Sequence, residues 1–125
     1  MILRKTFRFE ASHILPRHPG KCSRLHGHSW TLYVYVEGTP DNETGFVMDY
    51  GDIKAAVQPI IDEELDHYHL NTSLGIYPSS EMILYWIGMR LKAKEFPWSK
   101  LALEETCTAY AELTREEFNR DHTTD

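Results

Sequence analysis

Two segments near the start of the chain alternate between apolar and polar side chains. The first runs from Leu3 to Ala11 and the second from about His28 to Glu37. Successive side chains of a strand point to opposite faces of a sheet, so each segment predicts a strand with one buried face. A loop with Pro16, Pro19 and Gly20 joins them, and we expect the two strands to pair as a hairpin. The expected buried sets are Leu3, Phe7, Phe9 and Ala11, and Trp30, Leu32, Val34 and Val36.

The middle of the chain has helical periodicity instead. Asp49 is a candidate N-cap for a first helix, in which Pro59 predicts a kink or an early end. A second helix is expected to open at Ser79 or Ser80, with Glu81 in its first turn. The apolar positions are Ile53, Val57, Ile60, Ile61 and Leu65 in the first helix, and Met82, Ile83, Trp86, Ile87 and Leu91 in the second.

Two further strands are predicted at the end of the chain. One covers residues 101–106, and the last runs roughly from Thr108 to Leu113, before a frayed acidic tail. Cys107 is expected to lie in the core of this region. The order ββααββ predicts an α+β fold, with an antiparallel sheet and two helices on one face, as a single domain over residues 1–125.

The size of the chain bears on where a binding site can lie. A chain of 125 residues can bury one core but leaves little room for a deep pocket of its own. A subunit interface is therefore an expected place for a small-molecule site. Tyr33 and Tyr35 lie on the otherwise polar face of the second strand, which suggests that another subunit covers this face.

Charge and composition exclude several classes of protein. The formal net charge of −6 argues against a general nucleic-acid-binding protein. No apolar run approaches the roughly 18 residues of a membrane span, the first residues are too charged for a signal peptide, and two cysteines make no disulfide framework. We expect a cytoplasmic protein without a membrane partner.

The charge is unevenly distributed. Residues 1–30 carry six basic side chains and one acidic side chain, and the other 95 carry seven and eighteen. Two interpretations remain open. The distribution can reflect a basic strand and a solvated acidic helical half, or it can form a local positive surface that attracts an anionic substrate.

Three histidines are predicted to meet at one end of the first two strands. His26 and His28 are two residues apart, so both imidazoles lie on one face of a strand. His13 ends the strand that pairs with it. Three imidazoles with an open fourth position are typical of a catalytic zinc site. A histidine alone is more often a surface or core residue, so the prediction depends on the combination.

Several other residues are candidates for catalysis or binding. Cys22 lies among Lys21 and Arg24, which favour a thiolate, and we expect it not to be a metal ligand. Asp66 next to His67 can form an acid–base pair. Glu105, in a partly buried strand, could receive the paired N–H groups of an aminopyrimidinone, and a surface salt bridge is the alternative.

Six motifs in order resemble the 6-pyruvoyl-tetrahydropterin synthase family over nearly the whole chain. They are residues 9–13 (FEASH), 22–28 (CSRLHGH), 45–50 (GFVMDY), 65–71 (LDHYHLN), 78–81 (PSSE) and 105–106 (ET). The Cys-x3-His-Gly-His spacing is similar to that of the bacterial 6-carboxy-5,6,7,8-tetrahydropterin synthase branch, which serves queuosine and 7-deazapurine biosynthesis.

This resemblance implies a fold, a reaction and a set of roles. The fold is the tunnelling fold (T-fold), in which subunits join their sheets into a trimeric barrel and two trimers stack as a homohexamer with intersubunit sites. The substrate is 7,8-dihydroneopterin triphosphate, which is converted to 6-carboxy-5,6,7,8-tetrahydropterin with release of acetaldehyde and triphosphate. The implied zinc ligands are His13, His26 and His28.

The implied proton-transfer set is Cys22, Asp66 and His67, and the implied pterin-binding residues are Glu105 and Thr106. Charge alone suggests Arg17, His18, Lys21 and Arg24 for the triphosphate. The alternatives are a synthase that forms 6-pyruvoyl-tetrahydropterin without side-chain cleavage and a non-catalytic oligomer that binds zinc or pterin.

Overall fold

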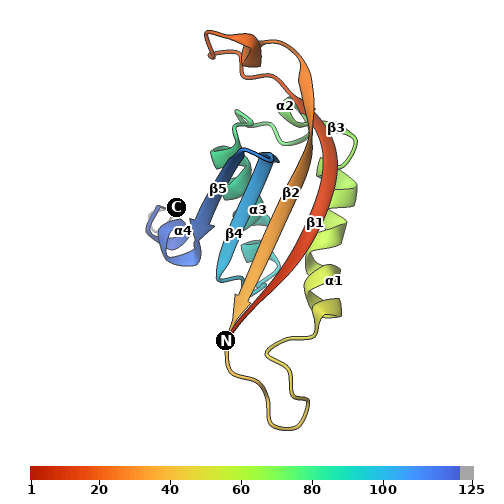
Figure 1. The fold of residues 1–125 in the computed structure, drawn as a ribbon, viewed down its shortest axis with the longest axis vertical. Coiled ribbons are helices and arrows are strands. Elements are labelled where there is room, and N and C mark those ends of the chain that lie inside the picture. The colour runs from red at the N-terminus through yellow and green to blue at the C-terminus, as the bar shows by residue number, and fades with distance from the viewer. Residues whose placement is uncertain (122–125) are drawn as a thin grey trace.

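A five-stranded sheet with the strand order β3-β1-β2-β4-β5 forms the centre of the computed structural model, which describes residues 1–121 (Figure 1). The strands are β1 (Ile2–His13), β2 (His26–Glu37), β3 (Tyr68–His69), β4 (Lys100–Thr106) and β5 (Ala109–Thr114). The pairings β1–β2, β2–β4 and β4–β5 are antiparallel, as predicted. The prediction of a wholly antiparallel sheet is wrong at one edge, where β3 runs parallel to β1.

The long β1–β2 pairing determines the geometry of one end of the sheet. Both strands have 12 residues, and their register places Phe9 opposite Trp30 and His13 opposite His26. β2 begins at His26, earlier than the alternation of apolar residues indicated. The pairing therefore continues past the hydrophobic segment and includes the predicted metal-binding residues.

Two helices, α1 (Tyr50–Ile60) and α3 (Ser80–Ala93), cover one face of this sheet (Figure 1). Both predicted N-caps are confirmed. The Asp49 carboxylate accepts a hydrogen bond from the Gly51 N–H at 2.7 Å, and the Ser79 hydroxyl accepts one from the Met82 N–H at 3.2 Å. Among residues 1–121, no helix combines the length and apolar character that a membrane crossing requires.

The first helix, whose apolar positions were expected to continue to Leu65, is interrupted near Pro59, where a kink or an early end was predicted. α1 ends one residue after Pro59, which has no N–H to donate to the preceding turn, and the π-helical turn Ile61–Leu65 follows. The chain then forms β3 and the short helix α2 (Leu70–Ser73). A two-residue strand is too short to produce an alternating pattern, so the sequence carried no signal for β3.

The C-terminal part of the described chain differs from the prediction at two places. Residues 115–121 form the helix α4 (Arg115–Asp121), where a frayed tail was expected, and residues 122–125 lie outside the described part. Phe118 anchors α4 because its buried ring contacts Trp98 at a centroid distance of 5.2 Å. Cys107 was expected in the core but is exposed, since β4 ends at Thr106 and Cys107 lies in the turn to β5.

The packing of α4 gives a stability prediction at Gly88 in α3. A Cβ at this position would lie 2.9 Å from the Phe118 ring and 3.0 Å from the Trp98 ring. Overpacking costs about 1–3 kcal/mol, which exceeds the roughly 0.8–1 kcal/mol that alanine gains over glycine in a helix. We expect Gly88→Ala to lower the free energy of unfolding in urea, whereas Met89→Ala, at an exposed neighbour, should change it by less than about 0.5 kcal/mol. Equal stability of Gly88→Ala and the unmodified protein would contradict this packing.

Candidate functional site

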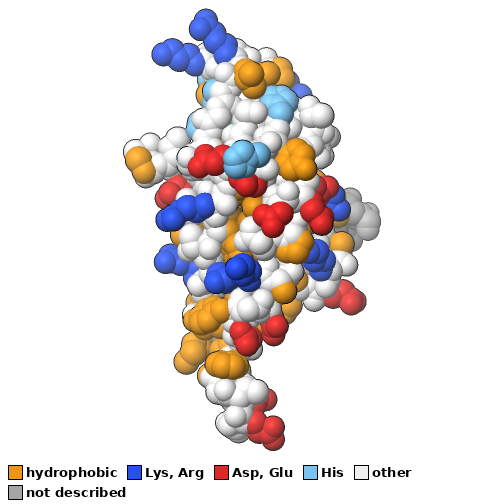
Figure 2. All heavy atoms as spheres, turned by 90° about the vertical axis from the view of Figure 1, so that its right-hand side faces the viewer, with side chains coloured by type: hydrophobic (Ala, Val, Ile, Leu, Met, Phe, Trp, Pro, Cys, Tyr) orange, Lys and Arg blue, Asp and Glu red, His pale blue; other side chains and the backbone are white. Residues whose placement is uncertain are grey.

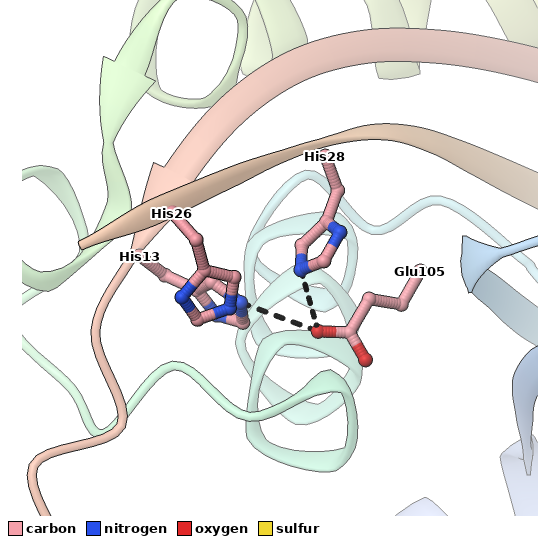
Figure 3. A group of neighbouring side chains, drawn as sticks. All are labelled: His13, His26, His28 and Glu105. Atoms are coloured by element: carbon pink, nitrogen blue, oxygen red, sulfur yellow. Dashed lines mark ion pairs between the residues drawn. The ribbon is translucent and has the colours of Figure 1, made fainter. Parts of the chain in front are cut away.

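Three imidazoles and one carboxylate converge at the end of the β1–β2 pairing. His13, His26 and His28 point toward one another and toward Glu105, which comes from β4 (Figure 3). One ligand atom from each residue lies within 4.8 Å of the others. His13 is fully buried, and the other three residues are half-buried. The structure thus brings together the three histidines predicted from the sequence and adds a carboxylate to them.

Backbone carbonyls orient two of these imidazoles. His13 Nδ1 lies 2.8 Å from the Pro78 carbonyl oxygen, and His26 Nδ1 lies 2.7 Å from the Arg24 carbonyl oxygen. A carbonyl oxygen only accepts hydrogen bonds, so each Nδ1 is the donor. In the neutral imidazole, Nε2 then carries the lone pair. This arrangement is typical of histidines that bind a metal through Nε2.

The inward-facing nitrogens fit a divalent cation. The Nε2 atoms of His13 and His28 are buried, and neither has a hydrogen-bond partner within residues 1–121. Burial lowers the pKa of both imidazoles, which favours their neutral, metal-binding form. Glu105 Oε1 lies 3.2 Å from His13 Nε2 and 3.1 Å from His28 Nε2. Imidazole nitrogens and carboxylate oxygens are common ligands of zinc.

A cavity of about 310 Å³ opens beside this cluster. Cys22, in a 3₁₀ turn (Lys21–Ser23) of the β1–β2 loop, lines the cavity together with Lys21, His28 and Glu105. Thr106 lines it as well. The cavity therefore joins a thiol, an ammonium group and the candidate metal ligands on one surface.

The other basic residues suggested for the triphosphate lie elsewhere on the loop. Arg24 and His18 are exposed, and the Arg17 guanidinium lies over the Tyr77 ring at 3.9 Å from its centroid. Figure 2 shows Lys and Arg side chains at the tip of the molecule, where this loop lies, with histidines close below.

Asp66 and His67 form the predicted pair at the opposite edge of β1. Asp66 Oδ2 lies 2.9 Å from His67 Nδ1. The Glu10 N–H donates to Asp66 Oδ1 at 2.9 Å, and the His67 N–H donates to the Glu10 carbonyl oxygen at 2.6 Å. These bonds hold the backbone of His67 in the left-handed region, at φ 64°. Residues other than glycine rarely adopt this conformation. The hydrogen bond from Glu10, followed by that from His67, lowers the pKa of Asp66.

The structure does not place Cys22 and His67 in the same cavity. His67 lines a second cavity of about 490 Å³ with Glu10, Ser12 and His69, and its side chain is 78% exposed. The Ser12 hydroxyl lies 3.0 Å from His69 Nδ1 in the same region. Within one chain, the thiol and the Asp–His pair therefore line different cavities, and His28 lines both.

Two contacts that hold the histidine cluster in place were not predicted from the sequence. The Pro78 carbonyl group is 65 residues from the imidazole that it contacts. The Asn71 amide bonds both backbone groups of Ile14, the residue after His13, with two bonds of 2.8 Å. Neither residue type signals such a contact, because it depends on chain segments that meet only in the folded protein.

Comparisons with known proteins agree with this fold. A sequence profile described as 6-pyruvoyl tetrahydropterin synthase matches residues 2–116. The chain belongs to this family. It is 47% identical over 116 residues to a Synechocystis protein named 6-carboxy-5,6,7,8-tetrahydropterin synthase, covering 88% of this chain and 90% of the relative. It is also 36% identical over 84 residues to a dihydroneopterin monophosphate aldolase of Pyrococcus furiosus, covering 67% and 68% of the two chains.

The solved structures identify the fold. The 6-pyruvoyl tetrahydropterin synthase of Caenorhabditis elegans superposes with a TM-score of 0.83 at 22% sequence identity, covering 91% of this chain and 94% of that one. The family resemblance predicted from the sequence is therefore confirmed, and so is the tunnelling fold of the individual chain.

Because the lone pairs of the three histidines converge, we expect zinc binding to depend on these side chains. His28→Ala should lose at least about tenfold in zinc affinity, since even an indirect support of a ligand is worth about 10–100-fold. His69→Ala removes an imidazole outside the cluster and should keep the zinc of the unmodified protein. Elemental analysis after dialysis measures the difference, and an unchanged zinc content in His28→Ala would contradict the site.

The lowered pKa of Asp66 predicts a pH-dependent contribution to stability. Its ordinary value is 3.8, so the stabilisation from the ionised carboxylate is complete above about pH 4 and is lost as the pH falls through the lowered pKa. In the metal-free protein, Asp66→Asn should cost more stability at pH 7 than at pH 3, measured by urea unfolding. Asp62→Asn, at an exposed carboxylate, serves as the control. An equal cost of Asp66→Asn at both values would contradict this role.

Proposed function

We propose that this protein is a zinc-dependent lyase that converts 7,8-dihydroneopterin triphosphate to 6-carboxy-5,6,7,8-tetrahydropterin, with release of acetaldehyde and triphosphate, in queuosine or 7-deazapurine biosynthesis. The observation that carries the proposal is the convergence of three Nε2 atoms beside Cys22 and Glu105. The high identity to the Synechocystis synthase supports the choice of reaction within the family.

His13, His26 and His28 would hold the zinc ion through Nε2. A bound zinc ion supplies a Lewis acid that polarises the hydroxyl groups of the substrate side chain and stabilises developing negative charge. The backbone carbonyls at Pro78 and Arg24 keep two of the imidazoles in the required tautomer.

The pterin ring would bind to Glu105 and Thr106. An aminopyrimidinone offers two parallel N–H groups, and a carboxylate accepts both in the same plane. Glu105 is half-buried and lines the Cys22 cavity. A pterin ring bound to Glu105 would direct the side chain of the substrate toward the histidines. Lys21 on the same wall favours the negatively charged triphosphate.

Cys22 and His67 would transfer protons on opposite sides of the substrate. Cys22 as thiolate removes a proton from the side chain, and His67 donates or accepts one as a general acid–base. Asp66 orients His67 through its Nδ1, so that Nε2 faces outward. Elimination of triphosphate follows from these transfers, and one water molecule supplies the second oxygen of the carboxyl group when the side chain is cleaved to release acetaldehyde.

The separation of Cys22 from His67 within one chain supports a site shared between subunits. β5 pairs with β4 alone in the described chain, and one side of β1 is unpaired before its short contact with β3. Unpaired edges of this kind accept strands from other copies. We propose a homohexamer of two trimeric barrels, in which the exposed His67 of one subunit completes the Cys22 cavity of its neighbour.

The decisive experiment supplies zinc-loaded protein with 7,8-dihydroneopterin triphosphate. The unmodified protein should release triphosphate and acetaldehyde and form the 6-carboxy product, identified by mass. Cys22→Ala should lower the rate about 10²–10⁴-fold, the usual contribution of general acid–base catalysis. Cys107→Ala removes the exposed thiol of the β4–β5 turn and should leave the rate unchanged.

Each other outcome has a defined meaning. If the unmodified protein binds pterin but releases neither triphosphate nor acetaldehyde, the lyase proposal fails. Triphosphate release with a 6-pyruvoyl product would identify the synthase without side-chain cleavage. If Cys22→Ala is as active as the unmodified protein, the role of Cys22 alone is wrong.

Mixing two inactive variants tests the shared site. Cys22→Ala and His67→Ala should each be inactive alone. If they are unfolded and refolded together, mixed oligomers contain some interfaces with an intact Cys22 and an intact His67, and these should recover part of the activity. Absence of any recovery, in mixtures that size-exclusion chromatography shows to be oligomeric, would place both residues in the site of a single subunit.

A further inference from the structure

The Glu105 carboxylate contacts two imidazoles in a way that neutral groups do not favour. Its oxygen Oε1 lies 3.2 Å from His13 Nε2 and 3.1 Å from His28 Nε2, and these are its only ion-pair partners within residues 1–121. His13 donates its Nδ1 proton to Pro78, so its Nε2 is an acceptor. A carboxylate oxygen is an acceptor as well. Two acceptors that face each other in a partly buried place repel each other unless a proton or a metal cation lies between them.

The same distances suit ligands that share one ion. Zinc binds imidazole nitrogen and carboxylate oxygen at about 2.0–2.2 Å, so neighbouring ligand atoms of a tetrahedral site lie about 3.3–3.6 Å apart. Both distances from Glu105 Oε1 are close to this separation. A carboxylate also neutralises part of the charge that a dication brings into a half-buried site.

The substrate of the proposed reaction competes for this carboxylate. Two parallel N–H groups of an aminopyrimidinone require both oxygens of Glu105, so the carboxylate cannot hold the ring and remain on the metal in the same geometry. A site with four protein ligands is closed, whereas a site with three has room for substrate. The two states of Glu105 therefore correspond to a closed and an open metal site.

We propose that Glu105 is a fourth metal ligand in the substrate-free protein and that the aminopyrimidinone ring of the substrate displaces it from the metal. Recognition of the ring then opens the coordination position that the hydroxyl groups of the substrate side chain occupy. A molecule without the ring would find the position closed. This inference rests on the proposed function in taking a pterin as the substrate.

Cobalt(II) in place of zinc makes the ligand exchange visible, because its absorption spectrum reports the number and type of ligands. The protein is loaded with cobalt and titrated with unsubstituted pterin, which has the ring but no side-chain hydroxyl groups. The variant is Glu105→Gln, which keeps the size of the side chain. The control is Glu104→Gln, the adjacent residue of β4, which does not belong to the group of converging ligands.

The expected results are specific to exchange at Glu105. Without pterin, Glu105→Gln should differ in spectrum from the unmodified protein and from Glu104→Gln, and competition with a chelator should show at least about tenfold weaker metal binding. Pterin should change the spectrum of the unmodified protein and of Glu104→Gln but not that of Glu105→Gln. If Glu105→Gln does not fold, Glu105→Asp, which shortens the reach of the carboxylate, should show the altered spectrum.

Two results would overturn the inference. One is a spectrum and metal affinity of Glu105→Gln that equal those of the unmodified protein, which would leave the three-histidine site and the proposed reaction intact. The other is a pterin-induced change of equal size in Glu105→Gln, which would mean that pterin binds the metal directly. Failure of the proposed function is separate, because it would appear as a lack of turnover by the unmodified protein.

Discussion

The antiparallel pairing of β1 with β2 is the constraint on which the site depends. Its register places His13 opposite His26, and the period of two brings His28 to the same face. A shift of one residue in this register would turn one set of imidazoles to the other face. The apolar sets that pack against α1 and α3 oppose such a shift, since it would expose Phe9 and Trp30. The hydrophobic core therefore also specifies the geometry of the candidate metal centre.

The parts of the fold that local patterns encode were predictable, and the parts that depend on long-range contacts were not. Alternation revealed β1 and β2, and capping residues marked the starts of α1 and α3. β3 forms where the chain after Leu65 pairs with the edge of β1. α4 is held in place by the packing of Phe118 against Trp98. Glu105 was recognised as a partly buried acid, but only the folded structure shows that its carboxylate lies against the imidazoles of His13 and His28.

The candidate catalytic residues lie in two parts of the fold, with Cys22 in one part and Asp66 and His67 in the other. Cys22 shares a cavity with the histidines because both belong to the β1–β2 hairpin and its loop. Asp66 and His67 are bound to the backbone of Glu10, at the edge where β1 has a free side. A chain of this size leaves little room to enclose a substrate, and the proposed homohexamer would bring the two cavities of neighbouring copies together.

The ligands of bound zinc test the central claim most directly. X-ray absorption of the zinc-loaded protein resolves nitrogen and oxygen ligands at about 2.0–2.2 Å from a sulfur ligand at about 2.3 Å. The account predicts nitrogen and oxygen ligands alone, with an imidazole scattering pattern, because His13, His26 and His28 hold the metal and Cys22 remains free to transfer protons. A sulfur ligand that disappears in Cys22→Ala would contradict it.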